Sequence, residues 1–337
     1  MAASQTASGQ ERGEAAETPS TGEVENKNEG GVTSEQSEAT APPEPWMQLI
    51  RLRKSDPSDG DIERLVHEQV RADLATESLA VDYNIVFLYD DYTLVRSDTD
   101  RVYKALTTLA DRTKPLLLIL NSGGGNIAPA YFIAKICREY SSDRFEIAVP
   151  RRAKSAATLI CCGADQIHMG SLSELGPLDP QFEGVPALAL KYSIEHLAEL
   201  AKRYPAASDM FAAYLGKALR IEALGYYERV AESAVQYAER LLRSRRNGVT
   251  SADDATEIAR RLVYAYKDHG FAIEANEASE IFGKAVVHIN SPQYALANRL
   301  YQTLDLLSII LRDGYNRHFS FTGSASSGCL IAKREAE

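Results

Sequence analysis

The chain has 337 residues, of which 45% are hydrophobic and 25% are charged, as in soluble globular proteins with one large domain or two smaller ones. Its net charge of −10 is concentrated in residues 1–45, where nine glutamates accompany only Arg12 and Lys27. The nearly balanced remainder argues against a nucleic-acid binder, which would usually show a basic face. No stretch approaches the ~18 apolar residues of a membrane span, and the acidic N-terminus is unlike a signal or transit peptide.

Residues 1–45 are Glu, Ser, Thr, Gly, Ala and Pro with almost no large apolar side chains. Such a segment cannot bury enough surface to offset its ordering entropy, so we predict a disordered acidic tail, with tethering or partner binding as the alternative. Residues 46–80 are predicted to form a helical lead-in. The main domain is expected over 81–290, and residues 291–337 are expected to hold a last helix and a loose tail after His318.

Short apolar runs alternate with helical patterns across the main domain. Because strands that alternate with helices form parallel sheets with right-handed crossovers, the sequence predicts an α/β fold built from βαβ units, with a helical C-terminal half. The expected strands are 83–89, 115–120, 145–149, 167–169 and 282–289. The expected helices are 97–112, 127–140, 155–162, 186–203, a long or broken helix over 207–246, a helix capped by 250–254, and 292–313.

The four cysteines are Cys137, Cys161, Cys162 and Cys329, and they form no CxxC pattern or His/Cys cluster typical of zinc sites. Cys161 and Cys162 are adjacent and cannot readily pair with each other. We therefore predict reduced core thiols in a cytoplasmic protein, with no metal and no cofactor.

Two segments fall at the carboxyl ends of expected strands, where sites form in such sheets. The turn Asn121-Ser122-Gly123-Gly124-Gly125-Asn126 brings backbone amides to a helix N-terminus, where they can hold negative charge. Ser155 begins a later helix of small residues. An oxyanion cradle and a hydroxyl nucleophile are what acyl transfer needs. Phosphate binding is a rival, but neither a Walker loop nor GxGxxG spacing is present, while the rival role of Ser155 is a helix cap.

Together these segments resemble the Clp/crotonase superfamily of serine peptidases. Asn121-Ser122-Gly123-Gly124-Gly125 is similar to the Asn-Ser-Pro-Gly-Gly turn of Clp proteases, with Gly123 in place of the usual proline. Ala153-Lys154-Ser155-Ala156-Ala157 is similar to their nucleophile segment and to that of signal peptide peptidase A. With Glu174-Leu175-Gly176-Pro177-Leu178-Asp179-Pro180-Gln181, it resembles the serine dehydrogenase proteinase family. The resemblance runs from about Tyr83 to Ile289.

The resemblance implies a metal-independent serine endopeptidase. Ser155 becomes the nucleophile that attacks a carbonyl. The N–H groups of Gly125 and Ala156, with Gly124 shaping the turn, become the oxyanion hole. Losing one such donor typically costs ~10²–10³ in rate.

The general base is less well defined. Clp proteases use a histidine after the nucleophile helix, but the matching region, Leu175–Pro180, contains none. Signal peptide peptidases use a lysine further along the chain, and a buried lysine with a depressed pKa can deprotonate a serine. Lys191 and Lys202 are the candidates, and we favour Lys191 because it lies nearer the loop that returns to the site. His168 is a further candidate base, although a core position suits it better.

Other polar residues near these segments receive lesser roles. Lys154 adjoins Ser155, but neighbouring helix residues point apart, so it is predicted to face solvent or the substrate backbone. Asp179 either orients a base or fixes its loop, and we favour the loop. His196 and His269 have no partner visible in the sequence.

Two function classes follow. The first is a Ser–Lys peptidase acting on peptides or on membrane-protein segments supplied by a partner. The second is a non-hydrolytic protein of the same fold, either an acyl-CoA-type enzyme, which would not need Ser155, or an inactive scaffold. Members of this superfamily usually assemble into rings or stacked oligomers, and we therefore predict a homo-oligomer. The apolar faces of 207–246 and 292–313 are candidates for its contacts, with packing inside the chain's own core as an equally good interpretation.

Overall fold

The computed structural model describes residues 44–182, 185–186, 189–218, 221–246 and 252–333. Contacts within the chain divide it into two units, Met1–Pro42 and Pro43–Glu337, and the elements below all belong to the second. The predicted acidic tail lies outside the described residues, apart from its last two.

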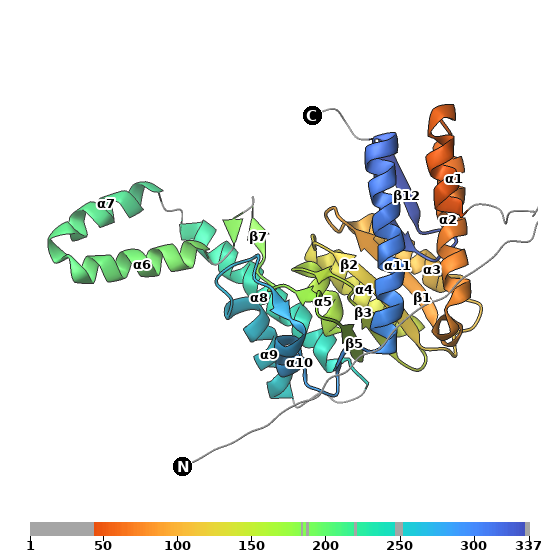
Figure 1. Ribbon diagram of the computed structural model, residues 1–337. Helices are drawn as coiled ribbons and strands as arrows, with labels where there is room; N and C mark the ends of the chain where they lie inside the picture. The colour runs from red at the N-terminus through yellow and green to blue at the C-terminus, as the bar shows by residue number, and fades with distance from the viewer. Residues whose placement is uncertain (1–43, 183–184, 187–188, 219–220, 247–251, 334–337) are drawn as a thin grey trace, which may run out of the picture. The chain divides into compact units, whose positions relative to one another are not determined.

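Two helices, α1 (Pro45–Leu52) and α2 (Asp59–Thr76), form the lead-in. Helix α2 begins where Ser58 Oγ accepts a hydrogen bond from the N–H of Asp61, which satisfies one of the free amides of the first turn. Its apolar face packs against α11 (Pro292–Ile309), which lies beside it in Figure 1. The buried apolar residues of α2 are Ile62, Leu65, Val66 and Val70.

The central sheet has the strand order β10-β5-β3-β2-β1-β11-β12. All pairs from β10 to β1 are parallel, so the predicted α/β fold is confirmed. Every residue of β2 is buried, because helices cover both faces of such a sheet and its strands become continuous apolar runs. The parallel strands are β1 (Asn84–Asp90), β2 (Leu116–Ser122), β3 (Phe145–Ala148), β5 (Gln166–Met169) and β10 (Val287–Ile289).

The sheet continues in an antiparallel hairpin made of β11 (Arg317–Gly323) and β12 (Cys329–Lys333). The sequence predicts a loose tail after His318, and the structure differs here because β11 pairs with β1. Phe319 and Phe321 alternate with polar neighbours, which is the period of a strand, and in the structure the neighbours Ser320 and Thr322 are buried as well.

Helices follow the strands as predicted in the first half of the domain. These are α3 (Arg96–Thr107), α4 (Ile127–Tyr140) and α5 (Ala156–Cys162). The later helices are α6 (Ala189–Arg203), α7 (Ser208–Ala218), α8 (Ile221–Arg243), α9 (Ala252–Tyr264) and α10 (Ala275–Phe282). Short 3₁₀ turns lie at Arg53–Ser55, Ser78–Asp82 and Pro205–Ala207, and a π turn lies at Ile310–Gly314. Within the described ranges, no helix has the length and hydropathy needed to cross a bilayer.

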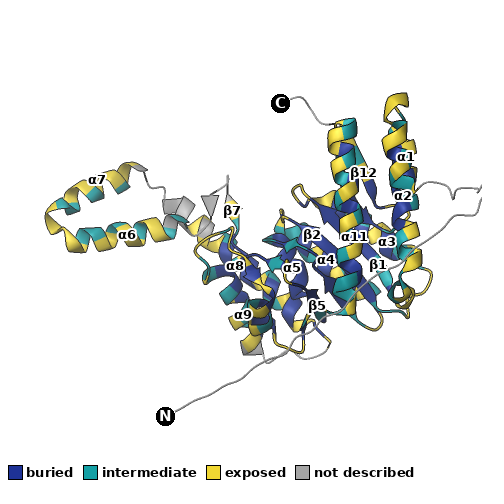
Figure 2. Cartoon of the chain, in the orientation of Figure 1, coloured by how far each residue is buried: buried dark blue, intermediate teal, exposed yellow. Residues whose placement is uncertain are grey.

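The predicted long or broken helix over 207–246 consists of α7 and α8, which is the broken alternative. The predicted strand over 282–289 needs correction, because it is mostly the end of α10 and a turn before β10. Helix α8 packs on α4, α5 and α9, whereas α6 contacts mainly α7 and the turn between them. Figure 2 shows the same contrast, with buried residues along the sheet and α5 and mostly exposed or intermediate residues on α6 and α7.

Three two-residue strands extend from the carboxyl end of β2. The first, β4 (Arg152–Ala153), pairs with β2 and with β6 (Glu174–Leu175), and β6 pairs with β9 (Ile273–Glu274). A separate antiparallel pair is formed by β7 (Gln181–Phe182) and β8 (Val185–Pro186). The three strands bring together segments that are far apart in the sequence.

His67 ties α2 to β12, and we expect it to make stability depend on pH. Its Nε2 accepts a hydrogen bond of 3.1 Å from the N–H of Cys329, which a protonated nitrogen could not do. Burial, with a contribution from the charge of Arg71, lowers the pKa of His67 below its usual 6.5. As pH falls below about 6.5 the unfolded chain therefore binds a proton that the folded chain resists, and the free energy of unfolding should decrease.

The His67→Gln variant tests this dependence, because the amide oxygen of glutamine can accept the same hydrogen bond without titrating. Urea unfolding at pH 7.5 and 5.5 should show a smaller loss of stability in the variant than in the wild type. Part of the loss should persist, since burial and the charge of His168 also lower the pKa of His288. An equal loss in both proteins would contradict the assignment to His67.

Candidate active site

The triple-glycine turn and the Ser155 segment are in direct contact. A Cβ atom placed on Gly124 would lie 2.5 Å from the carbonyl oxygen of Lys154, 3.0 Å from Ser155 Cβ and 3.1 Å from the amide nitrogen of Ala156. Gly124 also has a φ of +95°, which side-chain-bearing residues rarely adopt. The structure therefore brings together the two segments that the sequence singles out, and only glycine fits at their contact.

Gly125 is held by the β1–α3 loop. Its φ is +149°, and an added Cβ would lie 2.4 Å from the amide nitrogen of Leu94. The N–H of Leu94 donates to Gly124 O and the N–H of Asn126 donates to Leu94 O, both at 2.9 Å. For the amides of Gly125 and Ala156, by contrast, no acceptor is found in the part of the chain that the structure describes. Two N–H groups beside Ser155 are thus available to a ligand.

Ser155 has an unusual backbone conformation, with φ +49° and ψ −119°. It precedes α5 at the N-cap position, yet its side chain makes no capping hydrogen bond to any described residue. A non-glycine residue held in this region costs ~1–3 kcal/mol and is typical of functional sites. The helix-cap interpretation of Ser155 is therefore wrong.

The strain at Ser155 predicts a stability effect that is separate from chemistry. Replacing Ser155 with glycine removes the Cβ that makes this conformation costly, whereas Ser155→Ala keeps it. We expect the glycine variant to unfold at a higher denaturant concentration than the alanine variant. Its free energy of unfolding should be higher by about 1 kcal/mol, after allowing for the extra entropy of unfolded glycine. Chemical denaturation of the pair measures the difference, and a glycine variant less stable than the alanine variant would show that Ser155 is unstrained.

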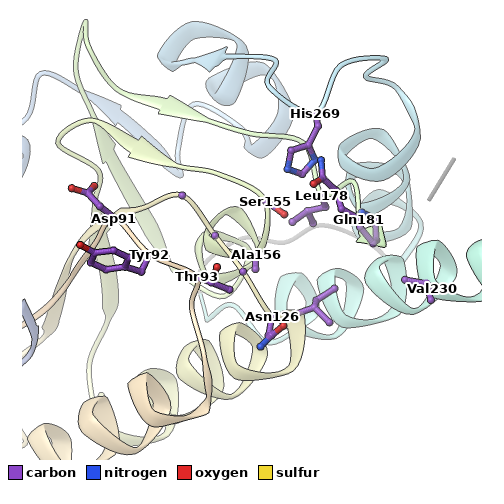
Figure 3. Close-up of a pocket in the computed structure, with 15 residues that line it drawn as sticks. Asp91, Tyr92, Thr93, Asn126, Ser155, Ala156, Leu178, Gln181, Val230 and His269 are labelled. Carbon is purple, nitrogen blue, oxygen red and sulfur yellow. The ribbon is translucent and has the colours of Figure 1, made fainter. Parts of the chain in front are cut away.

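Ser155 opens onto a pocket of about 660 Å³ at the carboxyl end of the sheet. Figure 3 shows the side chains that surround it, with Ser155 and His269 on the same side and Asp91 and Tyr92 on the other. The loops 91–93 and 123–127 supply most of the lining, together with Leu178, Pro180 and Gln181. Val230 of α8 contributes an apolar side chain.

His269 approaches Asp179 beside this pocket. The distance between His269 Nδ1 and Asp179 Oδ2 is 3.8 Å, which is an ion-pair contact but longer than a hydrogen bond. Asp179 is buried, and neither its Oδ1 nor His269 Nδ1 has a hydrogen-bond partner among the described residues. Hydrogen bonds of catalytic groups are often long in ligand-free proteins and shorten when a substrate binds. His269 and Asp179 are therefore close enough to form a hydrogen bond after a small movement.

The three short strands explain how the pocket gathers these residues. Strand β4 ends two residues before Ser155, β6 ends four residues before Asp179, and β9 begins four residues after His269. Because β6 pairs with both β4 and β9, the three segments lie next to one another. The sequence shows no sign of this pairing, and the place of His269 in the pocket could not be predicted from it. The one available indication was Asp179 in the quoted motif, since a carboxylate at this point can orient a histidine.

The structure places the two lysines predicted as bases elsewhere. Lys191 lines a different cavity of about 470 Å³ between α6, α8 and α9, in the company of Glu228 and Arg260. Lys202 donates a hydrogen bond of 2.6 Å to Glu199, and its side chain is 74% exposed. Neither lines the pocket of Ser155, because α6 runs from the β7–β8 pair toward α7 and not along the sheet.

His168 and Lys154 also have partners of their own. His168 is buried between Glu146 Oε2, 3.1 Å from its Nε2, and Ser291 Oγ, 2.9 Å from its Nδ1, as a core histidine would be. Lys154 does not face solvent or a substrate as the sequence predicts. It is only 16% exposed and binds Glu174.

Among the described residues, no group of three or more His, Cys, Asp and Glu side chains is arranged to hold a metal ion. The four cysteines are unpaired and buried, and burial raises the pKa of the Cys162 thiol to about 12. What the pocket offers is a strained serine, two backbone amides and a histidine beside a buried carboxylate.

A family model described as ClpP-like SDH-type serine proteinase matches residues 85–305, which is more than half of the chain. The chain belongs to this family. The matched range contains Ser155, Asp179 and His269.

Two curated relatives come from Methanocaldococcus jannaschii. Uncharacterized protein MJ0137 is 34% identical over 98 residues, which is 29% of this chain and 34% of that protein. Uncharacterized protein MJ1495 is 24% identical over 210 residues, or 62% of each chain. The chain thus spans less than two thirds of the length of either relative.

A solved structure of the 1510-N membrane-bound stomatin-specific protease, in a mutant form, aligns with 66% of this chain and 83% of its own. The sequence identity is 12% and the TM-score is 0.39. A likeness this weak identifies no shared site.

Proposed function

We propose that this protein is a serine endopeptidase in which Ser155 is the nucleophile, His269 is the general base and Asp179 orients His269. The observation that carries the proposal is that His269 lines the same pocket as the strained Ser155 while its Nδ1 lies 3.8 Å from a buried carboxylate oxygen. A nucleophile, a base and a third group that orients the base are the parts that acyl transfer by serine needs.

The reaction would follow from this arrangement. With Nδ1 directed at Asp179, Nε2 is the imidazole nitrogen left to accept the Ser155 proton as Oγ attacks the scissile carbonyl. The resulting imidazolium is stabilised by the Asp179 carboxylate and gives its proton to the leaving amine. Water then hydrolyses the acyl-enzyme by the same proton transfers in reverse.

The free amides of Gly125 and Ala156 are the proposed oxyanion hole. Both belong to the segments in contact through Gly124, so they are fixed before a substrate arrives. Preorganised donors of this kind stabilise the charge that develops on the carbonyl oxygen without reorganising during the reaction.

The order Ser155, Asp179, His269 along the chain is the order in α/β-hydrolases, in which the nucleophile also lies on a strained strand-to-helix turn. The same roles occur on unrelated folds in other orders, so geometry defines them. This geometry favours His269 over Lys191, which lines a separate cavity. It also favours hydrolysis over an acyl-CoA enzyme or a scaffold, neither of which would need a strained serine.

Peptides are the proposed substrates, including segments of membrane proteins delivered by a partner, and the proposed assembly is a homo-oligomer. Buried, unpaired cysteines fit a cytoplasmic location. Light scattering at micromolar concentration tests the assembly, and a monomeric mass would contradict it.

Labelling with a fluorophosphonate probe tests the catalytic proposal, because the probe reacts with activated serines. We expect the wild-type protein to be labelled at Ser155 and the Ser155→Ala variant not to be labelled. Well-folded wild-type protein that resists the probe would instead support the non-hydrolytic alternative.

A further inference from the structure

We propose that Lys154 is a positioning residue that fastens the loop carrying His269 to the segment carrying Ser155. The proposal rests on the role of His269 proposed above. It gives a function to a lysine that sits directly before the nucleophile and yet does not point into the pocket.

The ammonium group of Lys154 contacts two distant segments at once. Its Nζ lies 2.7 Å from Glu174 Oε2, 3.1 Å from Phe271 O and 3.4 Å from Gly270 O. Leu175 O lies at the limit of hydrogen bonding, 3.5 Å away. Because an ammonium group has three donors, it can bind the carboxylate and both loop carbonyls together.

These contacts link the chain segment of the nucleophile to the chain segment of the base. Lys154 is one residue before Ser155, and Gly270 and Phe271 are the two residues after His269. The side-chain stem is itself confined, because a Cβ on Gly176 would lie 2.7 Å from Lys154 Cδ. Because the methylene chain of Lys154 is confined and its ammonium group binds the loop, the loop is held at a fixed position relative to Ser155.

Among the described residues, the backbone N–H groups of the loop that carries His269 bond locally, those of Gly270 and Phe271 to Asp268. The ring of Phe271 packs on Tyr266 of the same loop. The loop joins the sheet through the two residues of β9, where Glu274 lies opposite Glu174. Like charges at opposite positions of an antiparallel pair are destabilising, and the Lys154 ammonium offsets this repulsion. Without Lys154, the backbone next to His269 should move relative to Ser155.

A purely structural ion pair with Glu174 is the alternative role for Lys154, and a double-mutant cycle separates the two. The second-order rate constant for fluorophosphonate labelling of Ser155 is measured in the wild type, Lys154→Met, His269→Ala and the double variant. If Lys154 acts through His269, Lys154→Met should slow labelling by roughly 10–100-fold, as misplacing a catalytic group does. In the His269→Ala background the same substitution should have no further effect.

Lys135→Met is the matched control, because it removes a lysine from a surface ion pair on α4 and should leave labelling unchanged. Should Lys154→Met fail to fold, Lys154→Gln replaces it, since its shorter amide cannot reach Gly270 and Phe271. Hydrogen exchange over residues 265–272 should be faster in either variant than in the wild type.

The outcomes are distinct. Labelling at the wild-type rate in a folded Lys154 variant, or an equal loss with and without His269, would overturn the positioning role. An unlabelled wild type, or a His269→Ala variant labelled at the wild-type rate, would overturn the proposed catalytic function instead.

Discussion

Replacing His269 with alanine is expected to reduce peptide hydrolysis by about 10⁴-fold, the loss that follows when the proton-accepting imidazole of a serine hydrolase is disabled. Without a neighbouring base, the Ser155 hydroxyl keeps its proton and is a weak nucleophile. The loss should appear in the rate of the chemical step, with little change in folding, because the His269 side chain is 29% exposed and lies in a loop.

Lys191→Met is the matched test of the competing assignment. Lys191 lines its own cavity with Glu195 and Glu228, away from Ser155, so its removal should leave hydrolysis close to the wild-type rate. Steady-state kinetics of the two variants on one peptide substrate decide between them. A large loss in Lys191→Met together with an active His269→Ala variant would restore the Ser–Lys mechanism.

Gly125→Ala is expected to lower the rate of hydrolysis by at least ~10², the effect of losing one oxyanion donor. An added Cβ would lie 2.4 Å from the amide nitrogen of Leu94, and the φ of +149° suits only glycine. The turn would have to shift, which would carry the Gly125 N–H away from the carbonyl oxygen it is proposed to bind.

Gly123→Ala provides the control within the same turn. No atom lies within 4 Å of a Cβ added at Gly123, and its φ is not in the left-handed region, so the substitution should be tolerated. Comparing the turnover of the two variants, with thermal melting to confirm folding, isolates the geometry of the amide. Equal activities in the two proteins would remove Gly125 from the oxyanion hole.

Much of the fold and half of the proposed site could be predicted from local sequence. Continuous apolar runs such as 115–120 mark buried parallel strands, and glycines mark a turn that no other residue fits. Because sites form at the carboxyl ends of such strands, the glycine turn and Ser155 could be placed together before their contact was known.

His269 could not be predicted in this way, because it depends on pairing between strands of two residues. Strands as short as β4, β6 and β9 show no period in the sequence, and their partners are far apart along the chain. The location of Lys191 could not be predicted for the same reason. Its distance along the chain from Ser155 says nothing about the direction in which α6 leaves the sheet.

The hairpin at the C-terminal end is a different case, since its pattern was present in the sequence. Phe319 and Phe321 alternate with polar residues before Gly323, the pattern typical of a strand that ends at a turn. The strand with which it pairs could not be predicted, because β11 pairs with β1, which is far away in the sequence. Long-range pairing of this kind depends on how the whole core packs.

The structure of the protein after reaction with a fluorophosphonate tests the central claim most directly, because the adduct imitates the tetrahedral intermediate. The account predicts phosphorus bonded to Ser155 Oγ, the phosphonyl oxygen within hydrogen-bonding distance of the Gly125 and Ala156 amides, and His269 Nε2 next to Ser155 Oγ. An adduct on another residue, or a lysine nitrogen in the place predicted for His269, would contradict it.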